Sequence, residues 1–256
     1  MKKHRHLAIA VLLFAFVSAC GARAQNEITL IGPNIIDTPV KELIPRFEAK
    51  SGRKVNAMFG AVVATKNRII QGESVDVVLV EVPYDSEVLS SGNVVPGSAT
   101  AIANVSIGVA VHKGAPQPDI SSADAVRSLL LGAKSISYPD PSKGAAAGIS
   151  VVEALKKLGI AEQMQPKTEL SQGGARAMAL VASGDAEVGL TFLPGMTNPG
   201  IEVIGALPPD VSPPTVVIGF VSAKAKDPAA AKQLLDYLSS EDAATVYKAQ
   251  RFRPGR

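Results

Sequence analysis

The chain is poor in the residues that carry most side-chain chemistry. Its 256 residues include no tryptophan, one cysteine and three histidines, and only 4% are aromatic. A single cysteine forms no internal disulfide, and no His or Cys cluster has metal-ligand spacing. A glycine-rich phosphate loop and a G-x-S-x-G nucleophile elbow are also missing. These absences argue against a disulfide scaffold, a metal centre, a nucleotide-binding enzyme and a serine hydrolase, and we expect no cofactor.

A strong excess of one charge is absent as well. The 26 Lys and Arg residues nearly balance the 23 Asp and Glu residues, and 46% of the chain is hydrophobic. This composition favours a folded body with a sizeable core over a disordered chain, and it lacks the basic surplus of a nucleic-acid-binding protein. A length near 250 residues permits one large domain or two small ones.

The N-terminus carries the only long uncharged apolar run, at residues 7–19 behind a basic start. This order is typical of a secretory signal, and the run is shorter than the roughly 20 residues that span a bilayer. Two processing sites are open: release before Gln25, or acylation at Cys20. We predict a signal peptide at residues 1–24 and a periplasmic protein, with a lipid anchor at Cys20 as the alternative.

After residue 26, short β-branched runs alternate with amphipathic segments, which is typical of an α/β fold. For example, Val40, Leu43 and Phe47 recur at helical spacing, and Gly52 follows them as a stop signal. Strands are expected at residues 27–31, 55–59, 75–80, 105–111, 135–138, 187–192, 201–204 and 215–221. Helices are expected at residues 39–51, 61–71, 123–131, 148–158, 174–181, 228–238 and 241–249.

Two segments rich in Gly, Pro or Ser interrupt this alternation, at residues 90–98 and 207–214. The block between them suggests a domain inserted between two halves of another, with a single continuous sheet as the alternative. We predict a first lobe from residues 26–103 and 207–256 and a second lobe from residues 104–206.

Four expected strand-to-helix turns are rich in small residues, at residues 32–38, 60–64, 140–148 and 171–176. Open α/β sheets bind ligands where such turns meet, next to helix N-termini that present unpaired N–H groups. Small residues at a single turn usually reflect tight-turn geometry alone. Four such turns without a competing catalytic set indicate an anion-binding cleft.

Several long segments resemble the substrate-binding proteins of molybdate-type ABC importers. They are residues 42–61 (ELIPRFEAKSGRKVNAMFGA), 71–79 (QGESVDVVL), 138–155 (YPDPSKGAAAGISVVEAL), 175–192 (ARAMALVASGDAEVGLTF) and 229–248 (AAAKQLLDYLSSEDAATVYK). The resemblance implies a two-lobed type II periplasmic binding protein fold, in which each lobe is a mostly parallel sheet flanked by helices and the ligand cleft lies between the lobes. It also implies a small anionic solute and an inner-membrane ABC permease as partners. We expect a monomer that is not an enzyme.

The resemblance also implies a ligand site built from five turns. Molybdate-type proteins hold a tetrahedral dianion there with neutral donors, typically a Ser in each of the first two turns, backbone N–H groups in the next two and a Tyr hydroxyl in the fifth. The corresponding residues here are Asn34, Val62 with Val63, Ala147, Gly174, and Thr191 with Phe192. A buried dianion that lacks these hydroxyl donors would lose several kcal/mol of hydrogen bonding.

Three basic residues are further candidates. Lys66 falls in the middle of an apolar helical stripe, so it either extends over the core to solvent or faces the cleft and pairs with an anion. Lys143 and Arg176 lie in cleft-side turns, where a solvated surface position is the alternative. Two ligand classes therefore stay open, a tetrahedral oxyanion such as molybdate or tungstate and a small organic anion. A secreted carboxylate-dependent enzyme or a free-standing ligand sensor is the alternative function.

Overall fold

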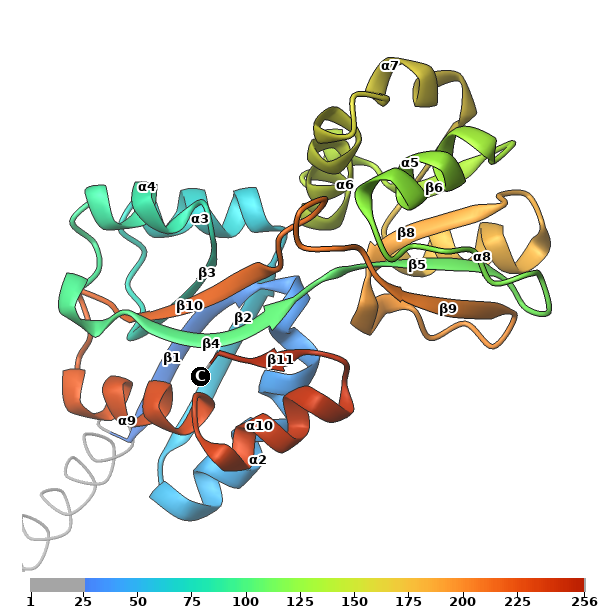
Figure 1. The fold of residues 1–256 in the computed structure, drawn as a ribbon. Coiled ribbons are helices and arrows are strands. Elements are labelled where there is room, and N and C mark those ends of the chain that lie inside the picture. Colours follow the sequence, from blue (N-terminus) through green and yellow to red (C-terminus); the bar gives the residue numbers. More distant parts are fainter. Residues whose placement is uncertain (1–25, 256) are drawn as a thin grey trace, which may run out of the picture.

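The computed structural model describes residues 26–255, which form two lobes joined by extended segments (Figure 1). The predicted signal peptide at residues 1–24 and the candidate anchor Cys20 lie outside the described residues. No helix within residues 26–255 has both the length and the apolar character needed to cross a membrane.

The first lobe is built on a six-stranded sheet with the order β11-β4-β10-β3-β1-β2. Its strands are β1 (Glu27–Pro33), β2 (Lys54–Gly60), β3 (Val77–Glu81), β4 (Thr100–Val105), β10 (Thr215–Val221) and β11 (Arg253–Pro254). Strand β1 pairs in parallel with β2 and β3, whereas β10 runs antiparallel between β3 and β4. Since helices cover both faces of this sheet, its central strands are almost continuously apolar.

The helices of the first lobe divide between the two faces of its sheet (Figure 1). On one face lie α2 (Asp37–Ser51), α9 (Pro228–Leu238) and α10 (Glu241–Ala249), and on the other lie α3 (Val62–Ile70) and α4 (Asp85–Ser90). Helix α2 ends as the sequence predicts, because Gly52 adopts a left-handed φ of 70° and donates its N–H to the Glu48 carbonyl at 2.9 Å.

The second lobe is built on a five-stranded sheet with the order β7-β6-β8-β5-β9. Its strands are β5 (Ile107–His112), β6 (Ile136–Pro139), β7 (Thr168–Ser171), β8 (Val188–Phe192) and β9 (Ile201–Ala206). Its helices are α5 (Ala123–Gly132), α6 (Ala146–Lys157), α7 (Ala161–Met164) and α8 (Gly174–Ser183). Helix α8 packs on one face of the sheet, and α5, α6 and α7 pack on the other.

Two segments carry the chain between the sheets. Strand β4 ends at Val105 in the first sheet and β5 begins at Ile107 in the second. The strand predicted at residues 105–111 is therefore confirmed as β5 from residue 107 on, whereas its first residue belongs to β4 of the other sheet. Apolar residues continue from Ala101 to Val111 with Asn104 and Ser106 as the polar interruptions. Periodicity alone does not reveal that the chain changes sheet at Ser106. The chain returns after β9 through residues 207–214. The single-sheet alternative is thereby excluded, while the lobe bounds 26–103, 104–206 and 207–256 stay predictions.

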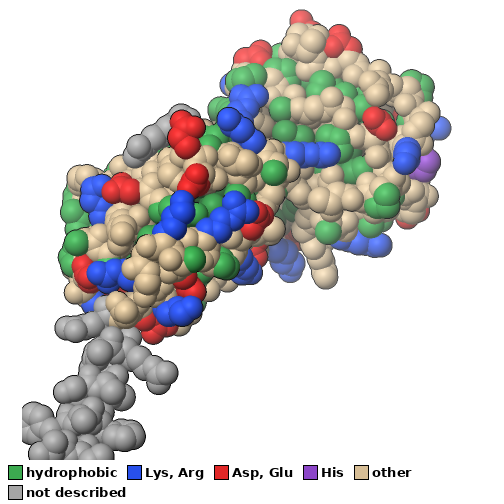
Figure 2. All heavy atoms as spheres, turned by 90° about the horizontal axis from the view of Figure 1, so that it is seen from below, with side chains coloured by type: hydrophobic (Ala, Val, Ile, Leu, Met, Phe, Trp, Pro, Cys, Tyr) green, Lys and Arg blue, Asp and Glu red, His purple; other side chains and the backbone are tan. Residues whose placement is uncertain are grey.

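The remaining differences concern short elements. Helices α4 and α7, strands β7 and β11 and most of β4 were not expected from the sequence. These elements are short or partly exposed, so they lack the long apolar periodicity that marks the other helices and strands. Over the face shown in Figure 2, basic and acidic side chains are intermixed on the first lobe, as the balanced composition predicts.

Candidate functional site

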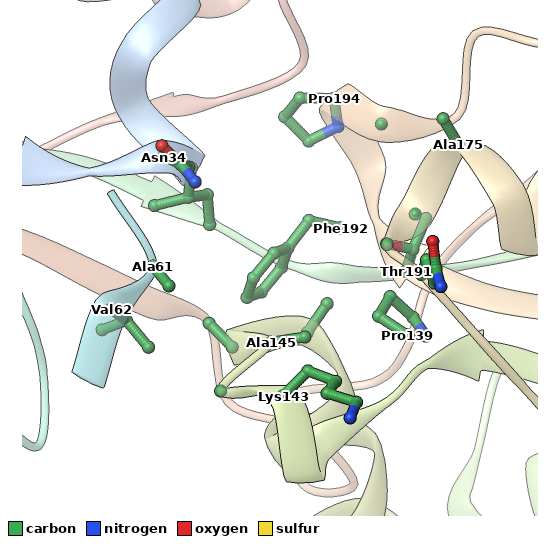
Figure 3. A pocket seen from close by; sticks show the side chains of 18 of the residues that line it. Asn34, Ala61, Val62, Pro139, Lys143, Ala145, Ala175, Thr191, Phe192 and Pro194 are labelled. Carbon is green, nitrogen blue, oxygen red and sulfur yellow. The ribbon is translucent and has the colours of Figure 1, made fainter. Parts of the chain in front are cut away.

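A cavity of about 710 Å³ lies between the two lobes. Figure 3 shows Asn34 and Val62 on the first-lobe side of this cavity and Lys143 and Thr191 on the second-lobe side, with the ring of Phe192 between them in this view. The size falls in the range of about 300–1,000 Å³ that is usual for small-molecule pockets. The cavity is therefore large enough to enclose an organic ligand.

Three helices begin at this cavity with free N-termini. Helices α3, α6 and α8 start at Val62, Ala146 and Gly174, which all line the cavity. None of the three has a side-chain cap or an acidic residue in its first turn. The first N–H groups of a helix have no partner within the helix, and they carry the positive end of its dipole. These N-termini are therefore available to an anion.

The long helices that begin away from the cavity differ in this respect. Helices α5, α9 and α10 are capped by the side chains of Ser122, Asp227 and Ser240, each of which accepts a hydrogen bond from a first-turn N–H. A side-chain cap satisfies an N–H group that would otherwise need water or a ligand. The chain thus caps these helix starts, whereas α3, α6 and α8 begin open at the cavity. Helix α2, which also begins at the cavity, has no side-chain cap but carries Asp37 in its first turn.

Two glycines allow the second-lobe helices to approach the strand ends closely. A Cβ atom at Gly148, in the first turn of α6, would lie 2.0 Å from the Pro139 carbonyl oxygen. A Cβ atom at Gly174 would lie 2.5 Å from Thr191 Oγ1. Because no larger side chain fits at these contacts, small residues are required there for packing.

Charged groups lie around the cavity on both lobes. Asp37 and Asp140 line it together with Lys143. Asp37 pairs with Lys41 at 2.9 Å, on the helix that Asp37 begins. Hydrogen bonds from Ser142, with a smaller contribution from the charge of Lys143, hold the pKa of Asp140 below its usual value. The two aspartates are thus held by neighbouring groups, and Lys143 is the lysine of the cavity wall.

Glu81 is the least expected residue of the cavity. It is the last residue of β3, its exposed fraction is 3%, and it lines the cavity from the first lobe. Burial raises the pKa of its carboxyl group from 4.5 to about 7, with no hydrogen bond or ion pair to oppose the shift. The available sequence signal was a single acidic residue at the end of the apolar run VDVVLV.

Seven of the ten residues that the sequence singled out line the cavity. They are Asn34, Val62, Lys143, Ala147, Gly174, Thr191 and Phe192. Other lining residues were not singled out by the sequence, among them Thr38, Glu81, Ser171 and Thr197. Thr38 and Ser171 lie within two of the predicted cleft turns, whereas Glu81 and Thr197 lie outside all four turns. Contact with a ligand stays a prediction for every residue of both sets.

Lys66 does not line the cavity. Its Nζ lies 2.8 Å from Glu87 Oε2 and 5.0 Å from the centroid of the Tyr84 ring. The apolar stripe on which Lys66 lies is covered by α4, a helix that the sequence did not reveal. The alternative in which Lys66 faces the cleft is therefore wrong, because its ammonium group lies beside α4 and not in the cavity.

Val63 and Arg176 also lie outside the cavity lining. Arg176 is exposed on α8. Val63 is half-buried, and its Cγ2 would lie 3.7 Å from a Cβ atom added at Gly144 of the other lobe. Val63 thus marks a place where the two lobes approach each other.

Within residues 26–255, no group of three or more His, Cys, Asp or Glu side chains is placed to hold a metal ion. The single His among these residues, His112, is exposed at the end of β5. The arrangement of the site is that of an anion-binding cleft with backbone donors, one lysine and one buried carboxyl group.

Comparison with known proteins gives similar sequences over nearly the whole chain. An aconitate isomerase of a Pseudomonas species is 29% identical over 255 residues, which cover 97% of this chain and 95% of that protein. The molybdate-binding protein ModA of Azotobacter vinelandii is 30% identical over 246 residues, which cover 94% of this chain and 95% of that protein. The resemblance to molybdate-type binding proteins is confirmed, while the expectation that the protein is not an enzyme stays a prediction.

The fold is shared with solved binding proteins. The periplasmic molybdate-binding protein of Azotobacter vinelandii superposes with a TM-score of 0.68 at 17% identity, over 88% of this chain and 98% of that one. The two-lobed type II fold is thereby confirmed. The profile of the family described as bacterial extracellular solute-binding protein matches residues 28–253. The chain belongs to this family of solute-binding proteins.

Proposed function

We propose that this protein is the extracytoplasmic receptor of an ABC importer and that its lobes close on a small organic anion with carboxylate groups. It would act as a monomer in the periplasm and pass its solute to an inner-membrane permease. The observation that carries this proposal is the set of three uncapped helix N-termini at one cavity, beside Lys143. Such a set binds negative charge through backbone N–H groups.

The size and walls of the cavity support an organic anion over a tetrahedral oxyanion. An oxyanion such as molybdate would occupy a small part of about 710 Å³. Val62 and Phe192, where a hydroxyl donor would be expected for molybdate, present apolar surface to the ligand space. A carboxylate ligand could place its charged ends at the helix N-termini and its carbon skeleton against these walls.

Calorimetry on a panel of anions tests this proposal. The panel contains molybdate, tungstate, sulfate, fumarate, citrate and cis-aconitate, and we expect at least one of the carboxylates to bind more tightly than molybdate. Tight molybdate binding without carboxylate binding would overturn the organic-anion proposal and leave an oxyanion receptor.

Two lysine variants give a matched comparison. We expect Lys143→Ala to weaken carboxylate binding more than ten-fold, or about 1.4 kcal/mol, because it removes the lysine of the cavity wall. Lys66→Ala should leave the dissociation constant unchanged, since Lys66 pairs with Glu87 outside the cavity. Equal effects of the two substitutions would show that Lys143 does not contact the ligand.

A second function is favoured by two observations together. The Pseudomonas relative is named an aconitate isomerase, and the cavity contains the buried carboxyl group of Glu81. This protein would then convert one unsaturated carboxylate into its isomer. Chromatography of cis-aconitate incubated with the purified protein tests this activity, and failure to form the trans isomer would leave binding alone.

A further inference from the structure

Glu81 differs from the other acidic side chain that is buried among the described residues. Asp76 is equally buried, but its two carboxylate oxygens accept hydrogen bonds from the N–H and hydroxyl of Thr29 and from the N–H of Lys226, at 2.7–2.8 Å. Asp76 therefore has a structural role. Glu81 has the same burial without such partners, and it lines the cavity. A buried carboxyl group without partners costs stability, so its position calls for a role in the cavity.

The wall opposite Glu81 has the complementary chemistry. Lys143 and the first turns of α6 and α8 belong to the second lobe, whereas Glu81 belongs to the first. One side of the cavity thus offers a proton acceptor, and the other offers a cation and backbone N–H groups. Removal of a proton from carbon near a carboxylate needs both, since a base takes the proton and donors stabilise the charge that develops on oxygen.

We propose that Glu81 is a catalytic residue that moves a proton between two carbons of a bound unsaturated carboxylate. The inference rests on the proposed binding of a carboxylate in this cavity, and it names the residue and the chemical step. The substrate class is an alkene that bears a carboxylate and has a CH₂ group next to the double bond.

The step balances without any co-reactant. The carboxylate of Glu81 takes a proton from the CH₂ carbon, and the electron pair of the broken C–H bond forms a new C=C bond to the neighbouring carbon. The electrons of the original double bond pass toward the far alkene carbon and its carboxylate, where Lys143 and the helix N–H groups stabilise the charge. Glu81 then gives the proton to that far carbon. The product is an isomer of the substrate, and Glu81 is ionised again.

The step requires an ionised Glu81, so its rate should depend on pH. The other titratable side chains that line the main cavity or the adjoining groove behind Glu81 are Asp37, Asp140, Lys143, Tyr84, Glu153 and Lys157. None of them contributes a hydrogen bond or ion pair to Glu81, whose pKa is set by burial to about 7. We therefore expect kcat/KM to rise with pH through a midpoint near 7.

Proton NMR in D₂O with cis-aconitate as the probe tests the proposal. With the wild-type protein, we expect the trans isomer to appear, and its new CH₂ group to carry deuterium to the extent that the Glu81 carboxyl exchanges its proton with solvent before returning it. Glu81→Gln should lower both rates by at least about 100-fold while cis-aconitate still binds, because the amide cannot accept the proton. Glu81→Asp keeps the carboxyl group at a shorter reach, and we expect an intermediate rate.

Glu153→Gln is the matched control, since Glu153 is exposed on α6 and lines only the adjoining groove. It should retain the wild-type rate and pH profile. Should Glu81→Gln fail to fold by circular dichroism, Glu81→Asp carries the test, and an unchanged rate in that variant counts against the proposal.

The outcomes separate this inference from the function on which it rests. Calorimetric binding of cis-aconitate without formation of the trans isomer would refute the role of Glu81 and leave the receptor for carboxylates intact. A wild-type rate in Glu81→Gln would likewise refute it. Failure of cis-aconitate and the other carboxylates to bind would refute both proposals.

Discussion

At the scale of single residues, Glu81 is the residue of the cavity whose ionised form is most strongly disfavoured by burial. Its carboxyl group prefers the neutral form in the folded protein, where burial raises its pKa from 4.5 to about 7. The unfolded chain releases this proton at a lower pH than the folded protein does. Stability is therefore highest below about pH 4.5 as far as this group is concerned, and it falls as the pH rises to about 7.

This linkage predicts the effect of Glu81→Gln on stability. The neutral amide cannot ionise, so the variant should be more stable than the wild type at pH 8, by up to about 3 kcal/mol, and close to it at pH 4.5. Urea unfolding at the two pH values measures the difference. The same difference at both values would mean that Glu81 titrates normally, and the acid–base role proposed above would lose its support.

At the scale of secondary-structure elements, three helices that begin at the cavity lack the side-chain caps found on three helices that begin elsewhere. Helices α5, α9 and α10 are capped by side chains, whereas α3, α6 and α8 begin uncapped at the cavity. An N-terminal cap contributes about 1 kcal/mol to stability. The three cavity helices thus forgo a stabilising interaction and keep their N–H groups free for a ligand.

A side-chain cap introduced at the start of α6 should increase the stability of the helix and reduce its capacity to bind an anion. Ala145 occupies the N-cap position of α6 with extended backbone angles, φ −78° and ψ 111°, which suit a capping side chain. We expect Ala145→Asp to stabilise the free protein by about 0.5–1 kcal/mol and to weaken anion binding at least ten-fold, because the carboxylate takes the N–H groups and repels the ligand. Thermal melting and calorimetry measure the two effects.

The converse change away from the cavity is the control. Ser122→Ala removes the cap of α5 and should lower stability by about 1 kcal/mol without altering ligand affinity. An unchanged affinity in Ala145→Asp would show that the α6 N-terminus does not contact the anion.

At the scale of the whole molecule, the two lobes touch in places beyond the crossover segments. The Arg251 guanidinium donates to the Met196 carbonyl oxygen at 3.2 Å, so the C-terminal segment of the first lobe reaches the second. Val63 of the first lobe and Gly144 of the second also approach each other.

A ligand that closes the lobes should also stabilise and compact the protein. At one hundred times the dissociation constant, a ligand that binds only the folded state adds about 2.7 kcal/mol to the free energy of unfolding. We expect small-angle scattering to show a smaller radius of gyration when the best carboxylate of the panel is saturating. A confirmed ligand with an unchanged radius would indicate that the lobes do not close on it.

Local sequence patterns determined most of the secondary structure. The spacing of Val40, Leu43 and Phe47 and the stop at Gly52 predicted α2, and the ends of α9, α10 and β10 agree with their predicted ranges. The strand-to-helix turns also identified the place of the cavity. These features depend on periodicity and turn chemistry within a few residues, which a sequence displays directly.

Tertiary structure alone decided the electrostatics of the site. Lys66 and Glu81 are single charges in apolar segments. The sequence left two placements open for Lys66, and it did not identify Glu81 as a site residue. Packing of α4 over α3 gives Lys66 a partner in Glu87, whereas the end of β3 leaves Glu81 buried at the cavity. The change of sheet at Ser106 was likewise decided by tertiary structure and not by the local sequence. A charge in an apolar segment acquires its partner, its solvent exposure and its pKa from residues distant in the chain, and local periodicity contains no information about them.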